Sequence, residues 1–243
     1  MAKRGVVFEP PAGGLFPSLL DGLMRLDREA SIGNVEEWLA AQGVTEVIGV
    51  DEAGRGPLAG PVMVCAVRMD LTSRAFWLRE GLDDSKKLSE SERERLARLI
   101  GTSLQTCVVE MSACDVDERN VLGASLEGMR RAVSGLRAPS GVIVLVDGNR
   151  RVPSLPHEQA TLVRGDGRSL AIAAASVVAK QTRDARMAEL GERYPGYGFA
   201  QHKGYPVPQH LRALEELGVT PEHRRSFAPV ARRLLSGENA SES

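Results

Sequence analysis

Short runs rich in apolar and β-branched residues divide the middle of the chain. They are Val47–Val50, Val62–Val67, Leu104–Met111 and Val142–Val146, and each is bounded by glycine, proline or polar residues. Runs of this length and composition are typical of β-strands. Because Val142–Val146 is apolar throughout, it predicts a central strand that is covered on both faces.

Apolar residues three and four positions apart predict helices between and after these strands. The predicted helices begin near Ser89, Val116, Leu170 and Pro208, and they end near Ile100, Leu136, Leu190 and Leu217. Ser89 also opens an S-x-x-E capping box, which is a common helix start. This order of elements indicates an α/β fold in which three antiparallel strands are followed by one or two parallel strands.

The two ends of the chain differ from its middle. The first residues, to about 16, are rich in glycine and proline, which favours flexibility. Residues 18–42 carry apolar side chains at rough helical spacing, which predicts one or two short helices. We divide the chain into an N-terminal, partly helical extension at 1–45, a main α/β domain at 46–190, a helical C-terminal subdomain at 191–236 and a flexible tail at 237–243.

Composition and charge place few limits on the partners of this chain. Its 243 residues suffice for one large domain with a small subdomain. The formal net charge of −1 indicates that any basic surface for nucleic acid is local. The three cysteines lack metal-site spacing, so we expect reduced thiols. Without a signal-peptide pattern or a membrane-length apolar run, we expect a cytoplasmic protein with no membrane contact.

Acidic residues follow two of the predicted strands. Asp51 and Glu52 come directly after the first strand, and Asp147 comes directly after Val146. If these strands are parallel neighbours, Asp147 lies beside Asp51, because functional groups collect where the strands of an α/β sheet end. Solvated turns are the alternative explanation for both acidic positions. Paired anions at the end of a buried strand favour a site, because close anions need a compensating cation.

A fourth carboxylate, Asp166, stands just ahead of the helix that begins near Leu170. An acid in this position also serves as an ordinary helix cap, so the sequence leaves both roles open. Together the four acids offer only oxygen ligands, which suits Mg²⁺ or Mn²⁺, and no cysteine and histidine cluster competes for zinc.

One long motif carries a resemblance to a known family. From Gly49 to Val62 the chain is GVDEAGRGPLAGPV, which resembles the signature of ribonuclease HII, the type 2 ribonuclease H family. Further segments resemble the family's DSKKL, AASxxAKxxRD and HKGY motifs at 84–88, 174–184 and 202–205, and the likeness extends over about 47–230. Arg164 stands where the family has lysine, and Val207 where it commonly has threonine.

The resemblance implies a ribonuclease H-like fold with a mixed five-stranded sheet flanked by helices, and a helical C-terminal subdomain. It implies an endonuclease that hydrolyses the RNA strand of RNA–DNA hybrids and incises at single ribonucleotides in duplex DNA. The implied mechanism is two-metal-ion hydrolysis with Mn²⁺ or Mg²⁺, leaving 3′-hydroxyl and 5′-phosphate ends. The expected catalytic residues and metal ligands are Asp51, Glu52, Asp147 and Asp166.

Further residues are expected to bind the nucleic acid. They are Gly54, Arg55, Gly56, Ser85, Lys86, Ser176, Lys180, His202, Lys203 and Tyr205. The Gly54–Gly56 turn is expected to read the 2′-hydroxyl with bare amides and carbonyls. Gly56 is expected to refuse a methyl group, for steric reasons or because of a positive φ. Tyr205 is expected to stack on the neighbouring deoxyribose.

Two other functions stay open at this stage. One is a different nuclease or recombinase of the same fold, which would use the same acids on another substrate. The other is a nucleic-acid-binding module without catalysis. No phosphate-binding G-x-x-x-x-G-K-[ST] motif is present, which argues against an ATPase. We expect a monomer and leave open a replication or repair protein as partner.

Overall fold

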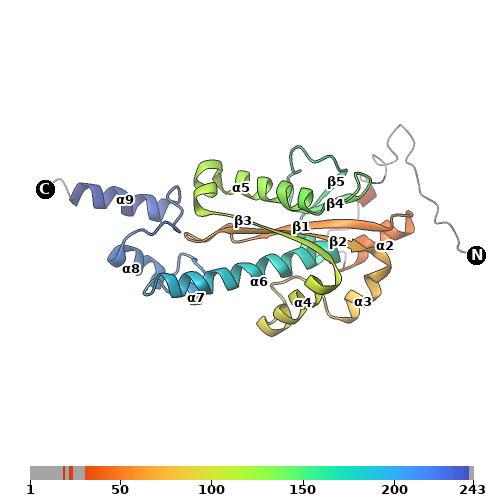
Figure 1. The fold of residues 1–243 in the computed structure, drawn as a ribbon, viewed down its shortest axis with the longest axis horizontal. Helices are drawn as coiled ribbons and strands as arrows, with labels where there is room; N and C mark the ends of the chain where they lie inside the picture. Colours follow the sequence, from red (N-terminus) through yellow and green to blue (C-terminus); the bar gives the residue numbers. More distant parts are fainter. Residues whose placement is uncertain (1–18, 20–21, 24–30, 241–243) are drawn as a thin grey trace, which may run out of the picture.

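A mixed β-sheet runs through the middle of the molecule (Figure 1). The computed structural model describes residues 19, 22–23 and 31–240. Within them the sheet has five strands in the order β3-β2-β1-β4-β5. The strands are β1 (Glu46–Ala53), β2 (Val62–Asp70), β3 (Gln105–Met111), β4 (Ile143–Asp147) and β5 (Gln159–Leu162). β1, β2 and β3 are antiparallel, whereas β4 and β5 add in parallel beside β1, which confirms the predicted order.

Helices cover both faces of the sheet. The helices of the described residues are α2 (Asn34–Ala41), α3 (Arg74–Arg79), α4 (Glu90–Ser103), α5 (Ala113–Gly135), α6 (Leu170–Arg193), α7 (Phe199–His202), α8 (Pro208–Leu217) and α9 (Ala228–Ala240), with 3₁₀ turns η1 (Leu71–Ser73) and η2 (Gly165–Gly167). In Figure 1, α5 lies on one side of the sheet, and α6, α4 and α3 lie on the other. The helix predicted from Val116 is interrupted at Asn120, whose φ of 56° breaks α5.

Alternation along the strands divides the hydrophobic core into two layers. Val47 and Leu145 belong to the layer under α6, whereas Val50 and Val146 belong to the layer under α5. The long helix α6 lies directly on β1, because a Cβ at Gly49 would overlap the backbone of Ala171. The alanine-rich start of α6 permits this close packing and brings the helix over the carboxyl ends of β1 and β4.

The N-terminal helix α2 packs into the same core layer. Val35 and Leu39 are fully buried there. Glu36 is also fully buried, and its Oε1 accepts hydrogen bonds from Ser169 Oγ at 2.6 Å and from the Ala171 amide at 3.2 Å. α2 is therefore tied to the start of α6. The flexibility expected of the first 16 residues falls outside the described residues.

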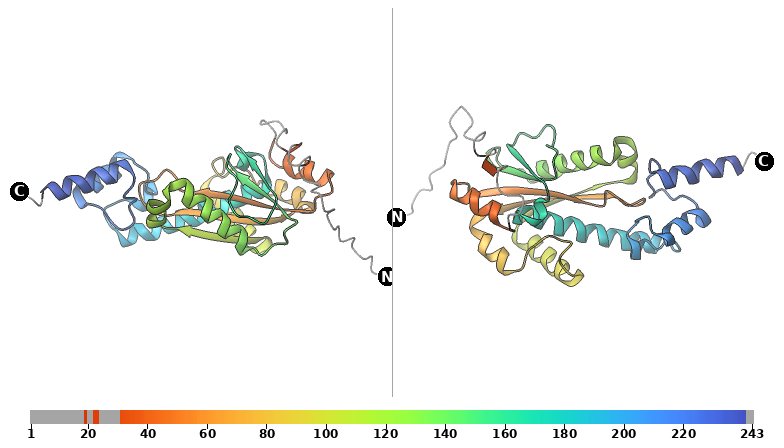
Figure 2. Two further views of the ribbon diagram at one scale, coloured as in Figure 1. Left: turned by 90° about the horizontal axis from the view of Figure 1, so that it is seen from above. Right: turned by 180° about the vertical axis from the view of Figure 1, so that it is seen from behind.

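The helices α7, α8 and α9 form one end of the molecule, opposite α2 (Figures 1 and 2). Two small apolar clusters, one around Phe199 and one around Leu214, hold them together. α9 continues to Ala240, which lies within the tail expected from Gly237. The residues after Ala240 lie outside the described part of the chain.

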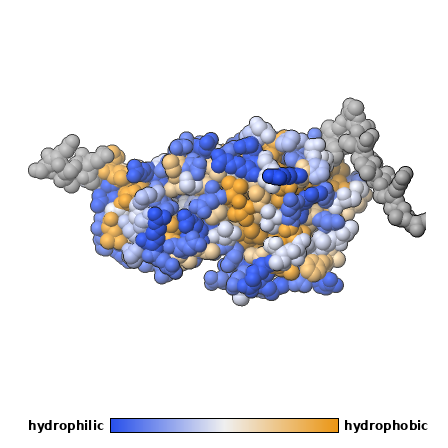
Figure 3. All heavy atoms as spheres, viewed as in Figure 1, coloured by the Kyte–Doolittle hydropathy of each residue, from blue (hydrophilic) through white to orange (hydrophobic). Residues whose placement is uncertain are grey.

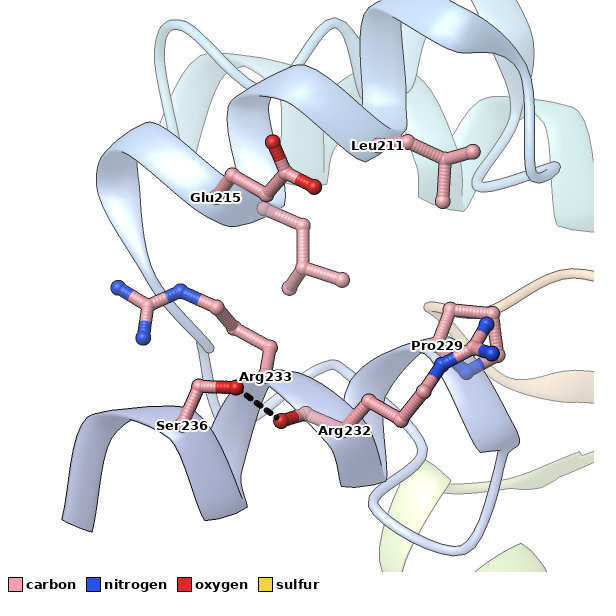
Figure 4. A pocket seen from close by; sticks show the side chains of 7 residues that line it. Leu211, Glu215, Pro229, Arg232, Arg233 and Ser236 are labelled. Atoms are coloured by element: carbon pink, nitrogen blue, oxygen red, sulfur yellow. Dashed lines mark hydrogen bonds between the residues drawn. The ribbon is translucent and has the colours of Figure 1, made fainter. Parts of the chain in front are cut away.

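A pocket of about 510 Å³ lies between α8 and α9. Leu211 and Glu215 of α8 and Arg232 of α9 border it (Figure 4). None of the acids or other residues expected to form the site lines it.

On the face drawn in Figure 3, hydrophobic residues gather in the middle and hydrophilic ones surround them. No helix among the described residues has the length and apolar character needed to cross a membrane.

Candidate active site

Asp51 and Asp147 lie side by side on the α6 face of the sheet. β1 and β4 are parallel, and Val50 pairs with Val146, so the two aspartates follow at the next position of the register. Asp51 lies four positions after Val47, and Asp147 lies two positions after Leu145. Residues an even number of positions apart in a strand share a face, so both aspartates lie on the face of the α6 core layer. The predicted parallel arrangement of these two strands is confirmed.

Glu52 differs from Asp51 in its position. Neighbouring residues in a strand point to opposite faces, so the Glu52 side chain leaves β1 on the other side from Asp51. Its charge nevertheless still acts on Asp51 and interacts with Asp147 and Lys86. β1 runs on to Ala53, and Asp51 and Glu52 still pair with β2 beyond the last pair of β1 with β4, Val50 with Val146. The expectation that both acids come after the first strand is therefore wrong. Pairing with β2 makes β1 longer than predicted, so both acids lie within it. The Glu52 carboxylate accepts a hydrogen bond from Arg55 Nη1 at 3.2 Å.

Asp166 reaches the same place from the turn before α6. It lies in η2, and its side chain is mostly buried. The adjacent Gly165 amide donates to Asp147 Oδ1 at 2.7 Å, which ties η2 to the end of β4. Lys86 Nζ lies 2.7 Å from Asp166 Oδ2. Asp166 thus joins Asp147, and a lysine ammonium sits on its outer oxygen.

The electrostatics of this cluster disfavour several negative charges together. Burial raises the pKa of Asp51 well above its ordinary value, and the charges of Asp147 and Glu52 raise it further. Burial also raises the pKa of Asp147, with a contribution from Asp166. For Glu52, burial raises the pKa although the Arg55 guanidinium opposes the rise. The carboxylates therefore need positive charge nearby to ionise together.

The donor set fits a hard divalent cation. All four acids offer oxygen ligands, and Lys86 shows that a cation is accommodated at Asp166. Across the described residues, no three acidic, histidine or cysteine side chains are already close enough to form a metal site.

Two of the predicted substrate contacts lie behind Asp51. Ser85 and Ser176 are both buried, and their hydroxyl oxygens are 2.9 Å apart. The Ser176 hydroxyl also hydrogen-bonds Asp51 and so favours its charged form. These serines therefore connect the loop before α4 and the helix α6 to the carboxylate. Lys180 is further along α6, where it pairs with Asp184 at 2.6 Å.

The Gly54–Gly56 turn leaves β1 next to the acids. Gly54 has a φ of 97°, and a Cβ there would overlap the Arg183 side chain. Gly56 is not among the residues with positive φ, and a Cβ on it would lie 3.6 Å from the ring of Tyr205, which is an ordinary van der Waals contact. The expectation that Gly56 refuses a methyl group is therefore wrong for the protein without nucleic acid. The expectation of bare carbonyls is wrong, because Arg224 donates hydrogen bonds to the Gly54 and Arg55 oxygens.

The aromatic and basic segment after α6 stands against this turn. Tyr205 is 45% exposed and faces Gly56. His202 has both ring nitrogens occupied: Nδ1 accepts from the Gly204 amide, and Nε2 contacts the Tyr197 carbonyl at 2.7 Å. Its ring therefore shapes the segment from inside. Lys203 Nζ lies 3.4 Å from the Asp184 carbonyl oxygen.

Two residues of this region were missed at the sequence level. Arg224 and Glu36 are fully buried ionisable residues, and both are hydrogen-bonded to the backbone of segments that hold site residues. Arg224 stands in the matched segment that ends near Val230, but no pattern separates a buried arginine from a surface one. Glu36 looked like any acid near the start of an amphipathic helix.

Comparisons with known proteins agree with this geometry. Residues 48–230 match a family model described as Ribonuclease HII. The Ribonuclease HII of Laribacter hongkongensis is 51% identical over 198 residues, which cover 81% of this chain and 98% of that protein.

Two solved structures are similar as well. The ribonuclease H2 from Pyrococcus horikoshii OT3 has a TM-score of 0.70 and 26% identity, over 79% of this chain and 99% of that one. The PCNA:RNase HII complex from Archaeoglobus fulgidus contains a chain with a TM-score of 0.64 and 26% identity, over 76% of this chain and 95% of that one.

Proposed function

The chain belongs to the ribonuclease HII family of metal-dependent endoribonucleases that cleave the RNA strand of RNA–DNA hybrids, and from this premise we propose that it also incises at single ribonucleotides in duplex DNA. The proposed products are a 3′-hydroxyl and a 5′-phosphate. The observation that carries the proposal is the register of β1 and β4, which sets Asp51 beside Asp147 next to an exposed glycine turn.

We propose that Asp51, Glu52, Asp147 and Asp166 hold two Mg²⁺ or Mn²⁺ ions. When bound, these ions activate a water molecule and stabilise the leaving oxygen. Asp51 and Asp147 share one face and supply adjacent oxygens, and Asp166 joins them through η2. The Ser176 hydroxyl hydrogen-bonds Asp51 and partly offsets the rise of its pKa. Glu52, on the other face, is held by Arg55 beside the turn.

Selection of a ribonucleotide requires contact with its 2′-hydroxyl. We assign this contact to the Gly54–Gly56 turn, whose last two residues are exposed. The Tyr205 ring stands against Gly56 and suits the sugar of the next nucleotide. Its stacking is worth about 1–3 kcal/mol. Lys86 of the loop before α4, Lys180 of α6 and Lys203 at the end of α7 suit the phosphates.

Further proposals concern the location, the oligomeric state, the domain division and the partners of the chain. We propose a cytoplasmic location, supported by the three free cysteines. We propose a monomer with the division at 45, 190 and 236 given above. Because the Archaeoglobus fulgidus relative was solved with PCNA, we propose that a replication protein of that kind is a partner.

The test is a cleavage assay on three duplexes: a long hybrid, DNA with one ribonucleotide, and an all-DNA control. Asp147→Asn should abolish metal-dependent cleavage of both ribonucleotide-containing duplexes while binding persists. Asp70→Asn is the matched control, because Asp70 is a surface cap of η1. A product map at single-nucleotide resolution defines the incision site and the ends.

Three outcomes would contradict the proposal. Cleavage of the hybrid without incision at the single ribonucleotide would limit the chain to hybrids. Equal cleavage of the all-DNA control would indicate another nuclease of this fold. Full activity of Asp147→Asn would remove that carboxylate from the chemistry.

A further inference from the structure

Arg224 is a buried cation that hydrogen-bonds only backbone oxygens. It lies between α8 and α9 and is 0% exposed. Its Nη2 donates to Gly54 O at 2.6 Å and to Gly60 O at 2.9 Å, its Nη1 donates to Arg55 O at 2.9 Å, and its Nε donates to Gly60 O at 3.1 Å. One guanidinium therefore holds three carbonyls of the glycine turn and the segment after it.

These bonds orient the turn. Because the carbonyls of Gly54 and Arg55 point inward to Arg224, the amides of the turn are left on its outer side. Within the part of the chain that the structure describes, the amides of Arg55 and Gly56 donate no hydrogen bond, and both residues are exposed. Consecutive free amides on a turn form a concave site for an anion or a hydroxyl oxygen.

Arg183 supports the same turn from α6. It is 1% exposed and lies under Gly54, where any Cβ would overlap it. It donates to Pro61 O at 3.0 Å and to Lys203 O at 3.0 Å. The turn and the segment that carries Tyr205 are therefore built on one support.

No carboxylate among the described residues forms an ion pair with either arginine. Two buried positive charges thus lie beneath the turn, and the carboxylates that act on them, Asp184 and Asp117, are not within salt-bridge distance. Burial lowers the pKa of Arg224 to about 9, and the charge of Arg183 adds to this effect. An arginine side chain is protonated at neutral pH, so both groups place positive charge beneath the turn, which suits a phosphate or a hydroxyl oxygen.

We propose that Arg224 is a positioning residue for ribonucleotide recognition, which fixes the turn so that the amides of Arg55 and Gly56 face the 2′-hydroxyl. This inference rests on the proposed function, since it assigns the support of the surface that reads the ribonucleotide. The backbone holds the Arg224 segment independently: its amide donates to Leu58 O at 2.8 Å, and Gly60 N donates to Glu222 O at 2.8 Å. The side chain can therefore be changed while the segment keeps its place.

The experiment compares the wild type with Arg224→Lys. Lysine keeps the charge but cannot bond three carbonyls with one planar group. Arg225→Lys is the matched control, because Arg225 is the exposed neighbour in the same segment. Binding to a duplex with one ribonucleotide and to the same duplex in all-DNA form is measured in chelator. Thermal melting and, in separate samples without chelator, Mn²⁺ affinity are measured for each variant.

For the wild type and Arg225→Lys we expect the same preference for the ribonucleotide. For Arg224→Lys we expect that preference to fall about tenfold, which corresponds to one hydrogen bond lost to the hydroxyl. Mn²⁺ affinity should not change, because the carboxylates are untouched. A preference retained in Arg224→Lys, or lost equally in Arg225→Lys, would overturn the inference and leave the proposed function standing.

A second measurement on the wild type covers the case in which Arg224→Lys does not fold. In amide NMR spectra, the Arg55 and Gly56 signals should shift more with the ribonucleotide duplex than with the all-DNA duplex. Equal shifts would overturn the inference. If the wild type binds and cleaves both duplexes equally, the proposed function fails and the inference fails with it.

Discussion

Lys86 Nζ lies 2.7 Å from Asp166 Oδ2, although the Lys86 side chain is 78% exposed. A long side chain from the loop before α4 thus covers a carboxylate that is buried in the turn before α6. Partial burial opposes ionisation of Lys86, but the hydrogen bond and charge of Asp166 raise its pKa overall. The ammonium stands where a divalent cation would bind, so the two compete for Asp166.

Removal of this ammonium should strengthen metal binding. Exposed ion pairs contribute about 0.2–1 kcal/mol, so Lys86→Ala should tighten Mn²⁺ binding by about 1.4- to fivefold in the absence of nucleic acid. Calorimetry measures this change. Lys87→Ala is the control, because Lys87 pairs with Asp83 instead. Unchanged or weaker Mn²⁺ binding in Lys86→Ala would show that the lysine does not compete.

The acid cluster should make the stability of the metal-free protein depend on pH. The folded-state pKa values of Asp51, Glu52 and Asp147 are raised. A raised pKa contributes stability that is fully present below the unfolded-state value, near 4, and is lost as pH rises through the folded-state value. Wild-type protein in chelator should therefore lose stability from acid toward neutral pH.

Asp51→Asn should remove part of this dependence. We expect its melting temperature in chelator to exceed that of the wild type at neutral pH, with the difference shrinking toward about pH 4. Melting curves over this range test the sign, with Asp70→Asn as the control. A clearly lower melting temperature of Asp51→Asn at neutral pH would mean that Asp51 acts mainly as a hydrogen-bond acceptor for Ser176.

The two glycines of the turn should respond differently to alanine. Gly54→Ala places a methyl group on Arg183 at a φ of 97°, so it should lower the stability by about 1 kcal/mol or more. Gly56→Ala meets only the Tyr205 ring, at 3.6 Å, and should leave the melting temperature unchanged. It should lower kcat/KM on a single ribonucleotide more than on a long hybrid, which offers many registers. Equal losses on both substrates would assign Gly56 to general phosphate positioning.

Glu36 should stabilise the fold from outside the matched family region, which begins at residue 48. Its buried carboxylate accepts bonds from Ser169 and Ala171 at the start of α6, so Glu36→Ala should lower the free energy of unfolding by about 1–3 kcal/mol. Denaturant unfolding measures the loss. Glu37→Ala is the control, since the Glu37 side chain is 65% exposed. Equal effects of the two variants would contradict a special role for the buried acid.

The sequence by itself determined the elements whose cause is local. Bounded apolar runs predicted four of the strands, and the capping box at Ser89 predicted the start of α4, because strand and helix periods and end caps depend on residues a few positions apart. The pairing of Asp51 with Asp147 also followed from order along the chain, since a strand covered on both faces has few places in an α/β sheet. The kink at Asn120 and the end of α9 were not foreseen.

Only the tertiary structure decided which distant groups support the site. Lys86 and Asp166 are 80 residues apart, and Arg224 is 170 residues from Gly54. The extent of β1 depends on how far β2 pairs with it. Because both acids lie within β1, the side chains of Asp51 and Glu52 leave the strand on different faces. Contacts of this kind arise from the packing of whole elements, and a lysine or arginine has the same local preferences whether it ends in solvent or on a buried oxygen. The burial of Arg224 and its bonds to the turn exist only when α6, α8 and the end of β1 are in place.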